Sequence, residues 1–165
     1  MSYKAKIIIT NGKFIISESR ESLWEGKEIR GIGKVLHFVE AAYLIYTGKA
    51  EIFDDKGNRL SFEEFFSKYC SDRRAWILFT VYFDLRKRGK KAKPGLTNSD
   101  IIVEHQKESL RIFVTEENTQ LPLRTIIEWI EDSLRKGYKP LMAVVDMYGD
   151  ITYYELSKIS LPKIK

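Results

Sequence analysis

The N-terminal part of the chain alternates between short apolar runs and polar breaks, a pattern that predicts a hairpin followed by a helix. Residues 4–10 and 13–17 are expected to form two strands around Asn11-Gly12, a pair favoured in two-residue hairpin turns. The polar residues 18–31 indicate a loop. Apolar side chains then recur at helical spacing over residues 34–47, which predicts an amphipathic helix.

A strand and a second helix are predicted next. Residues 49–53 have the length and apolar content of a strand. Ser61 is followed three residues later by Glu64, which is the capping-box pattern at the start of a helix, and this helix is expected to end near Tyr69. Together these elements predict a small α/β subdomain over residues 1–70.

The second half of the chain predicts the order α-β-β-α-β-β over residues 71–165. Asp72 suits the cap of a long helix, and Pro122 suits the first turn of a shorter one. The expected ranges are helices at 73–88 and 122–136 and strands at 101–104, 110–115, 141–145 and 151–156. In the shorter helix, the spacing predicts that Ile126, Ile127, Ile130 and Leu134 face inward. The expected fold class is α/β (α+β), with a mixed sheet flanked by helices in this second subdomain.

Composition narrows the class of protein. With 165 residues, of which 44% are hydrophobic and 13% aromatic, the chain can bury a core and is not generally disordered. Cys70 is the only cysteine and His37 and His105 are the only histidines, so we expect no disulfide, no metal site and no cofactor. No signal peptide is recognisable, and the apolar run 76–83 is too short to span a membrane, so we expect a soluble, cytoplasmic protein.

The positive charge is concentrated in one segment. The chain carries a formal net charge of +5, which favours acidic partners without requiring nucleic acid. Six basic residues follow the apolar face of the long helix before Pro94-Gly95 interrupts it, with Asp84 able to pair with Arg88 one turn on. These candidate RNA-binding residues are Arg86, Lys87, Arg88, Lys90, Lys91 and Lys93. A basic segment anchored to a core is typical of phosphate contact, although such a segment can also be an ordinary solvated face.

Three motifs, in sequence order, resemble the archaeal tRNA-intron endonuclease family. FVEAAYL at 38–44 is similar to the family's EA-x-YL helix. VYFDLRKRG at 81–89, followed by Lys93-Pro94-Gly95, is similar to its YxDLRxRG helix end. AVVDMYGDITYYE at 143–155 is similar to its AVVDxxGDxxYYE hairpin. The resemblance implies two α/β subdomains, the second nuclease-like.

The resemblance also implies a reaction. The family removes introns from precursor tRNA by a metal-free cleavage that leaves a 2′,3′-cyclic phosphate and a 5′-hydroxyl. It uses a Tyr, a His and a Lys. Chemically, a base must take the 2′-hydroxyl proton, an acid must protonate the leaving 5′-oxygen, and a cation must stabilise the charged transition state.

The sequence departs from the family pattern at the catalytic positions. In the family, Tyr ends one strand and His opens the next after a loop of several residues. Here residues 101–114 read IIVEHQKESLRIFV, so Glu104 falls where Tyr would stand, the loop is short, and His105 lies on the wrong side of it. Lys139 is near the position of the family's Lys and is the one vestigial candidate. No catalytic residue is therefore expected in this chain.

Such a chain is expected to be the non-catalytic, structural subunit of a heteromeric endonuclease. The expected partners are precursor tRNA and a catalytic subunit, in a two-plus-two heterotetramer. In the family, an acidic loop of one subunit enters a positive groove of its neighbour. In addition, Tyr153 and Tyr154 fit either a core and edge strand or pairing with a neighbouring subunit's last strand, because an apolar edge left open is an aggregation risk. Together these points give the candidate interface residues Asp146, Tyr148, Asp150, Tyr153 and Tyr154, although Asp146 and Asp150 are also typical turn residues.

Two other functions stay open at this point. The chain could be an active nuclease with a rearranged site, in which Glu104 is the base, His105 the acid and Lys139 the cation. A turn histidine next to Gln106 and Lys107 is more often a solvated surface group. Alternatively, the chain could be a stand-alone RNA-binding module.

Overall fold

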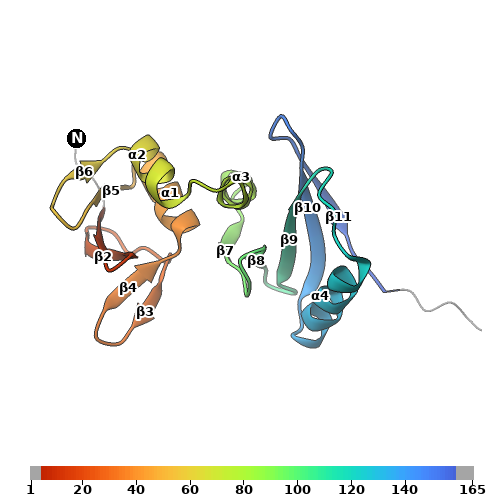
Figure 1. Ribbon diagram of the computed structural model, residues 1–165. Helices are drawn as coiled ribbons and strands as arrows, with labels where there is room; N and C mark the ends of the chain where they lie inside the picture. Colours follow the sequence, from red (N-terminus) through yellow and green to blue (C-terminus); the bar gives the residue numbers. More distant parts are fainter. Residues whose placement is uncertain (1–4, 159–165) are drawn as a thin grey trace, which may run out of the picture. The chain divides into compact units, whose positions relative to one another are not determined.

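The computed structural model describes residues 5–158, and the chain divides into two compact units, Met1–Phe79 (unit 1) and Thr80–Lys165 (unit 2). Each unit holds one mixed β-sheet with helices against it (Figure 1). The predicted α/β class, with a mixed sheet flanked by helices in the second half of the chain, is confirmed.

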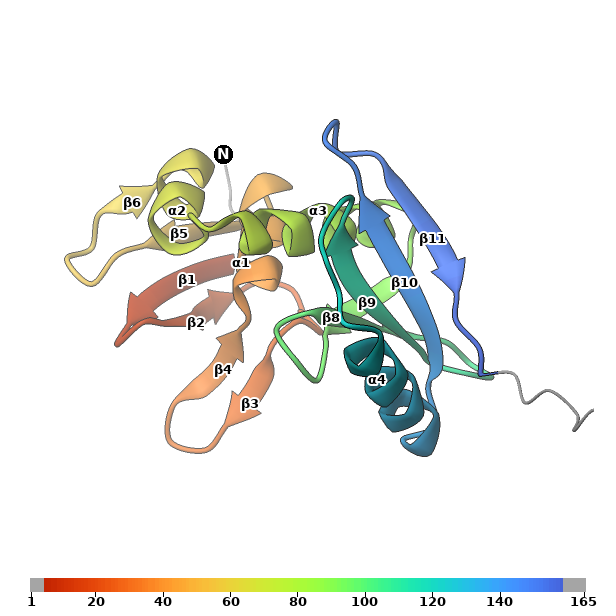
Figure 2. The ribbon, with the colours of Figure 1, turned by 45° about the vertical axis from the view of Figure 1, so that its right-hand side comes forward.

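Unit 1 contains a six-stranded sheet, here called sheet A, with the strand order β3-β4-β2-β1-β5-β6. Strands β1 and β5 run parallel, and the other neighbours are antiparallel. Both helices of the unit, α1 and α2, lie over the same side of this sheet (Figure 2). The elements are β1 Ala5–Thr10, β2 Lys13–Ser19, β3 Lys27–Ile29, β4 Gly33–Leu36, α1 Phe38–Tyr46, β5 Ala50–Phe53, β6 Arg59–Leu60 and α2 Phe62–Tyr69.

The core of unit 1 lies between sheet A and its helices. Along β1, the side chains of Ala5, Ile7 and Ile9 are buried, while the residues between them are partly exposed or exposed. Phe14 of β2, opposite Ile9, packs edge-on against Phe65 of α2 with ring centres 5.2 Å apart. One face of sheet A therefore carries the core, as the period of two along a strand requires.

Two expectations for unit 1 were wrong. Residues 18–31 are not all loop, because β3 forms within them, and the helix predicted from residue 34 begins only at Phe38. Residues 33–36 instead form β4, which pairs with β2 so that Leu36 lies opposite Phe14. The apolar residues of this stretch fit either period, and pairing with a strand distant in the sequence decided between them.

Both predicted helix starts that carry a capping residue are confirmed. The Ser61 side chain accepts a hydrogen bond from the Glu64 backbone N–H at 3.1 Å, and the Glu64 carboxylate accepts one from the Ser61 N–H at 2.8 Å. The Asp72 carboxylate accepts a hydrogen bond from the Ala75 N–H at 2.7 Å at the start of α3, which covers Arg73–Lys87. Side chains thus satisfy N–H groups that a helix terminus leaves open.

Unit 2 contains a five-stranded sheet, here called sheet B, with the order β11-β10-β9-β8-β7. Strands β9 and β10 run parallel, and the other neighbours are antiparallel. Its elements after α3 are β7 Lys91–Pro94, β8 Asp100–Glu104, β9 Leu110–Glu116, α4 Leu123–Arg135, β10 Lys139–Val145 and β11 Ile151–Glu155. The four strands predicted here are confirmed, and β7 was not foreseen.

The inward face of α4 agrees with the prediction only in part, since Ile126 and Ile130 are partly buried. Trp129 and Ser133 are buried, whereas Ile127 and Leu134 are 41% and 50% exposed, and Leu123 at the first turn is 73% exposed. The helix is rotated so that its buried side includes polar residues, because the sheet beneath it contains a buried arginine. Much of its apolar side is left at the surface.

That arginine is Arg111 in β9, whose side chain is 1% exposed. Its guanidinium donates to Asp100 in β8 at 2.8 Å and to Asp132 in α4 at 2.8 Å. It also donates to the Ser133 hydroxyl at 3.1 Å and lies over the Trp129 ring. A buried charge needs partners of opposite sign with good geometry, and this network fixes α4 on sheet B.

Candidate functional site

The six predicted RNA-binding residues do not lie on one continuous helix. Arg86 and Lys87 end α3, and Arg88 follows directly. Gly89, with φ of 76°, then reverses the chain so that Lys91 and Lys93 fall in strand β7. The basic segment is thus spread over a helix end, a turn and an edge strand of sheet B.

Several of these cations are already engaged within unit 2. Arg88 pairs with Asp84 at 2.8 Å, as the i,i+4 spacing predicts, and Arg86 donates to the Tyr82 hydroxyl at 2.9 Å. Lys91 and Lys93 both pair with one carboxylate at the end of β8. Within the described residues, Lys87 and Lys90 are exposed and take part in no ion pair or side-chain hydrogen bond. They are the cations of this segment available to an outside anion.

Glu104 is the carboxylate that Lys91 and Lys93 share. It lies opposite Lys91 in the β7–β8 pairing, and the Lys91 ammonium is 2.8 Å from it. Hydrogen bonds from Lys91 and then Lys93 lower the pKa of Glu104. A carboxylate held in its ionised form by two cations is a weak general base.

Lys139, the vestigial catalytic candidate, opens β10 at the same end of sheet B. Its ammonium pairs with Glu155 of β11 at 2.5 Å, and this hydrogen bond raises the pKa of Lys139. Glu155 was not among the residues predicted for the site. The antiparallel pairing of β10 with β11 brings it there, since Leu141 lies opposite Glu155.

Glu104 and Lys139 occupy opposite faces of sheet B. Side chains alternate along a strand, and directly paired residues share a face. Val103, Leu110 and Lys139 form one row across β8, β9 and β10, so Glu104, next to Val103, points to the other side. The Glu104 face also carries Arg111, which reaches α4, while the Lys139 face carries Tyr153, which reaches α3. The fold does not bring these two groups together on one face.

Neither histidine lies in a constellation of catalytic groups. His37 caps α1, where its Nδ1 accepts a hydrogen bond from the Val39 N–H at 3.3 Å, and burial lowers its pKa to about 4. His105 is exposed in the turn after β8. Among residues 5–158, no group of three His, Cys, Asp or Glu side chains is placed to hold a metal ion.

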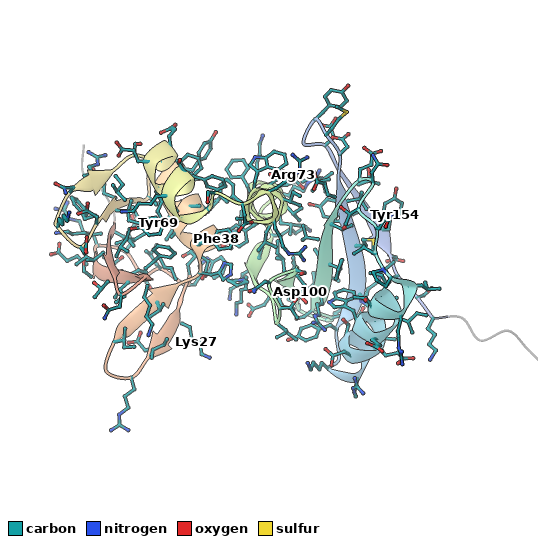
Figure 3. The ribbon with its side chains drawn as sticks, in the orientation of Figure 1. Lys27, Phe38, Tyr69, Arg73, Asp100 and Tyr154 are labelled. Carbon is teal, nitrogen blue, oxygen red and sulfur yellow. The ribbon has the colours of Figure 1, made fainter. Side chains whose placement is uncertain are left out.

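The β10–β11 hairpin contains the predicted interface residues. Asp146 accepts hydrogen bonds from the N–H groups of Tyr148 at 2.8 Å and Asp150 at 2.9 Å, so its carboxylate closes the turn. Tyr148 at the tip is 81% exposed. On β11, Tyr153 donates to Asp84 at 2.7 Å, and burial raises its pKa. Tyr154 points the other way and is half exposed (Figure 3).

This arrangement defines a class: a small two-unit α/β protein whose second unit is a mixed sheet between two helices, with a basic segment at its edge. Comparison with known proteins agrees. Residues 75–153 match the family model for the catalytic C-terminal domain of tRNA intron endonuclease, and residues 30–66 match the model for its N-terminal domain.

Relatives support the same assignment. The chain is 33% identical over 138 residues to the tRNA-splicing endonuclease of Thermococcus kodakarensis, covering 79% of this chain and 80% of that protein. It is 31% identical over 136 residues to the tRNA-splicing endonuclease of Methanococcus vannielii, covering 76% of each. It is 29% identical over 139 residues to that of Methanococcoides burtonii, covering 81% of this chain but 38% of the longer protein. The chain belongs to the tRNA intron endonuclease family.

The chain spans only about two fifths of the length of some of these relatives, such as the Methanococcoides burtonii protein at 38%. Among the described residues, no helix has both the length and the apolar character needed to cross a bilayer.

Proposed function

We propose that this chain is the non-catalytic, structural subunit of a heteromeric tRNA-splicing endonuclease, and that a partner chain cleaves the precursor tRNA. One observation carries the proposal. At the end of sheet B where the family's catalytic groups are expected, the charged side chains are held in ion pairs and lie on different faces of the sheet. Glu104, which the sequence pattern predicts to fall where the family has Tyr, is bound by Lys91 and Lys93. Lys139 is on the opposite face and paired with Glu155.

The same geometry weighs against a rearranged active site. A base and a cation that act on one phosphate must reach the same few ångströms of space. Glu104 and Lys139 point to opposite faces of sheet B, and both are neutralised by neighbours. His105, the proposed acid, lies in the turn with no partner that would orient it among the described residues.

The surface of unit 2 supports a role in assembly. Strand β11 is an edge of sheet B, and its outer backbone groups can pair with another strand. Tyr154 on this strand lies opposite Met142, on the α4 side of the sheet. We call the exposed apolar residues of α4 and β11 the assembly surface; they are Leu123, Ile127, Leu134 and Tyr154. Large apolar side chains gathered next to an open strand edge are typical of a subunit contact.

Reconstitution tests the proposal. The full chain is incubated with a precursor tRNA substrate alone, with a family member that retains Tyr, His and Lys at the three positions, and with both. We expect cleavage to require that second protein, and the product ends to be a cyclic phosphate and a 5′-hydroxyl. Cleavage by this chain alone, lost on His105→Ala, would establish the rearranged site instead. RNA binding by a chain that never associates with the second protein would establish a stand-alone module.

A further inference from the structure

The second face of sheet A has no helix of unit 1 against it. Both α1 and α2 lie over the face that carries Phe14 (Figures 1 and 2). On the other face, pairing places Ile8 opposite Ile15, Ile15 opposite Val35, and Val35 opposite Lys27. We call this the open face of sheet A. The three apolar side chains are partly exposed, unlike the buried row of Ala5, Ile7 and Ile9.

A hollow of about 300 Å³ lies on this side of unit 1, where the β1–β2 hairpin approaches the β3–β4 hairpin. Its lining is Thr10, Asn11, Lys13, Ile15, Gly31 and Ile32. The volume is at the lower end of the roughly 300–1,000 Å³ of small-molecule sites. Two isoleucines supply an apolar wall for a flat ring, and the Asn11 amide offers a hydrogen-bond donor and an acceptor to a polar ring edge.

Positive charge surrounds this hollow. Lys13 is part of the lining, Arg30 precedes Gly31 in the β3–β4 turn, and Lys27 projects on the same face from β3. Figure 3 labels Lys27 on the hairpin. All three side chains are exposed, and within residues 5–158 no ion pair or side-chain hydrogen bond engages them.

The acids of the open face lie away from the hollow. Glu18 and Glu51 are the residues opposite Lys6 in the strands on either side of β1. Glu51 also pairs with Arg59 at 2.9 Å. Glu51 is thus paired and Glu18 lies opposite a lysine, whereas the basic residues around the hollow have no acid paired with them among the described residues. Such a surface is complementary to a polyanion that carries flat apolar rings.

We propose that the open face of sheet A binds a single-stranded RNA segment, with one base in the hollow and neighbouring phosphates on Lys13, Lys27 and Arg30. Single-stranded RNA offers unstacked bases for an apolar wall, together with phosphates for the cations, whereas a duplex hides its bases. The site is separate from the basic segment of unit 2 and does not depend on whether the chain is catalytic. Four of the residues that line the hollow, Thr10, Asn11, Lys13 and Ile15, lie before residues 30–66, which match the N-terminal family model.

Binding of a fluorescein-labelled oligouridylate of about ten nucleotides to the full chain, followed by anisotropy, tests this site. The double variant Lys13→Gln, Arg30→Gln should bind about tenfold more weakly near physiological salt, and its log-log salt slope should be flatter by about 1.4. The matched control is Lys49→Gln, Lys68→Gln. Those lysines lie over the rings of Tyr43 in α1 and Tyr69 in α2, on the helix side of sheet A. The control should bind like the unaltered chain.

A second variant addresses the hollow itself. Ile32 is 40% exposed, so Ile32→Asp should fold normally while placing a negative charge where the base is expected. We expect it to weaken oligouridylate binding by at least tenfold, and a 4-thiouridine probe should crosslink within residues 10–32. Equal binding by both variants and the control, or crosslinks only to residues 86–93, would overturn the proposal. If the variants instead lose association with a protein partner while their RNA affinity is unchanged, the proposal would also be overturned and the open face would be assigned to protein contact.

Discussion

At the scale of single residues, the charged side chains at the end of sheet B are paired with one another. Glu104 accepts from two lysines, and Lys139 pairs with Glu155. A group that must exchange a proton with substrate needs a pKa near the working pH and an open approach. Here the ion pairs hold the carboxylate ionised and the ammonium protonated. These ion pairs support the proposed structural role.

His37 gives a residue-scale prediction on pH. Burial lowers its pKa from 6.5 to about 4 in the folded chain. Between these values the unfolded chain binds the proton and the folded chain does not, so the free energy of unfolding falls as the pH falls from 6.5 to 4. The contribution is fully present above pH 6.5, and its loss should reach up to about 3 kcal/mol.

Urea unfolding across this pH range measures the effect. His37→Asn keeps a good helix cap but removes the titrating ring, so its stability should change less between pH 6.5 and 4 than that of the unaltered chain. His105→Asn, at an exposed turn position, is the matched control and should keep the original dependence. An identical pH dependence in both variants would show that His37 does not carry it.

At the scale of elements, the basic segment holds two cations that are free among the described residues, Lys87 and Lys90, one on each side of the chain reversal at Gly89. Arg88, Lys91 and Lys93 are engaged in ion pairs. We expect Lys87→Gln, Lys90→Gln to weaken binding of precursor tRNA by the reconstituted complex and to flatten the log-log salt slope by about 1.4 to 1.8. The paired control Lys91→Gln, Lys93→Gln should change the slope less, because Glu104 already engages both ammonium groups. Equal changes in the two variants would contradict this division.

Helix α4 shows why the spacing of apolar residues does not always predict which side of a helix is buried. The apolar positions of α4 are those of an amphipathic helix, yet Trp129 and Ser133 face inward while Leu134 is half exposed. Arg111 decides this, because its guanidinium must reach Asp132 and Ser133 from the sheet below. The sequence signal of this network was Arg111 itself, a charged residue between the apolar residues Leu110 and Ile112 of a strand.

At the scale of the whole molecule, we predict that negative charges placed on the assembly surface prevent association. Leu134→Glu, Tyr154→Glu should abolish association with the proposed catalytic partner, because burying a carboxylate at an apolar contact is costly. Since both side chains are half exposed, the free energy of unfolding should change by less than about 1 kcal/mol. Size-exclusion chromatography with light scattering measures association, and Lys107→Glu in the β8–β9 turn is the control. Retained association would place the contact elsewhere.

The sequence alone determined the class of fold, the strands of the second half, the two capped helices and the family resemblance. These depend on local periods, on caps such as Ser61 and Asp72, and on short motifs. It also gave the hypothesis that Glu104 falls where the family has Tyr. These features are read from neighbours in the sequence, which is why they needed no tertiary contact.

Only the tertiary structure decided what lies next to what. It made residues 33–36 a strand through pairing with β2, put Glu104 and Lys139 on opposite faces of sheet B, and brought Glu155 to Lys139. It also left one face of sheet A without a helix of unit 1 against it, beside a basic hollow. The physical reason is that strand register and helix rotation are set by partners distant in the sequence. A local hydrophobic period does not identify those partners.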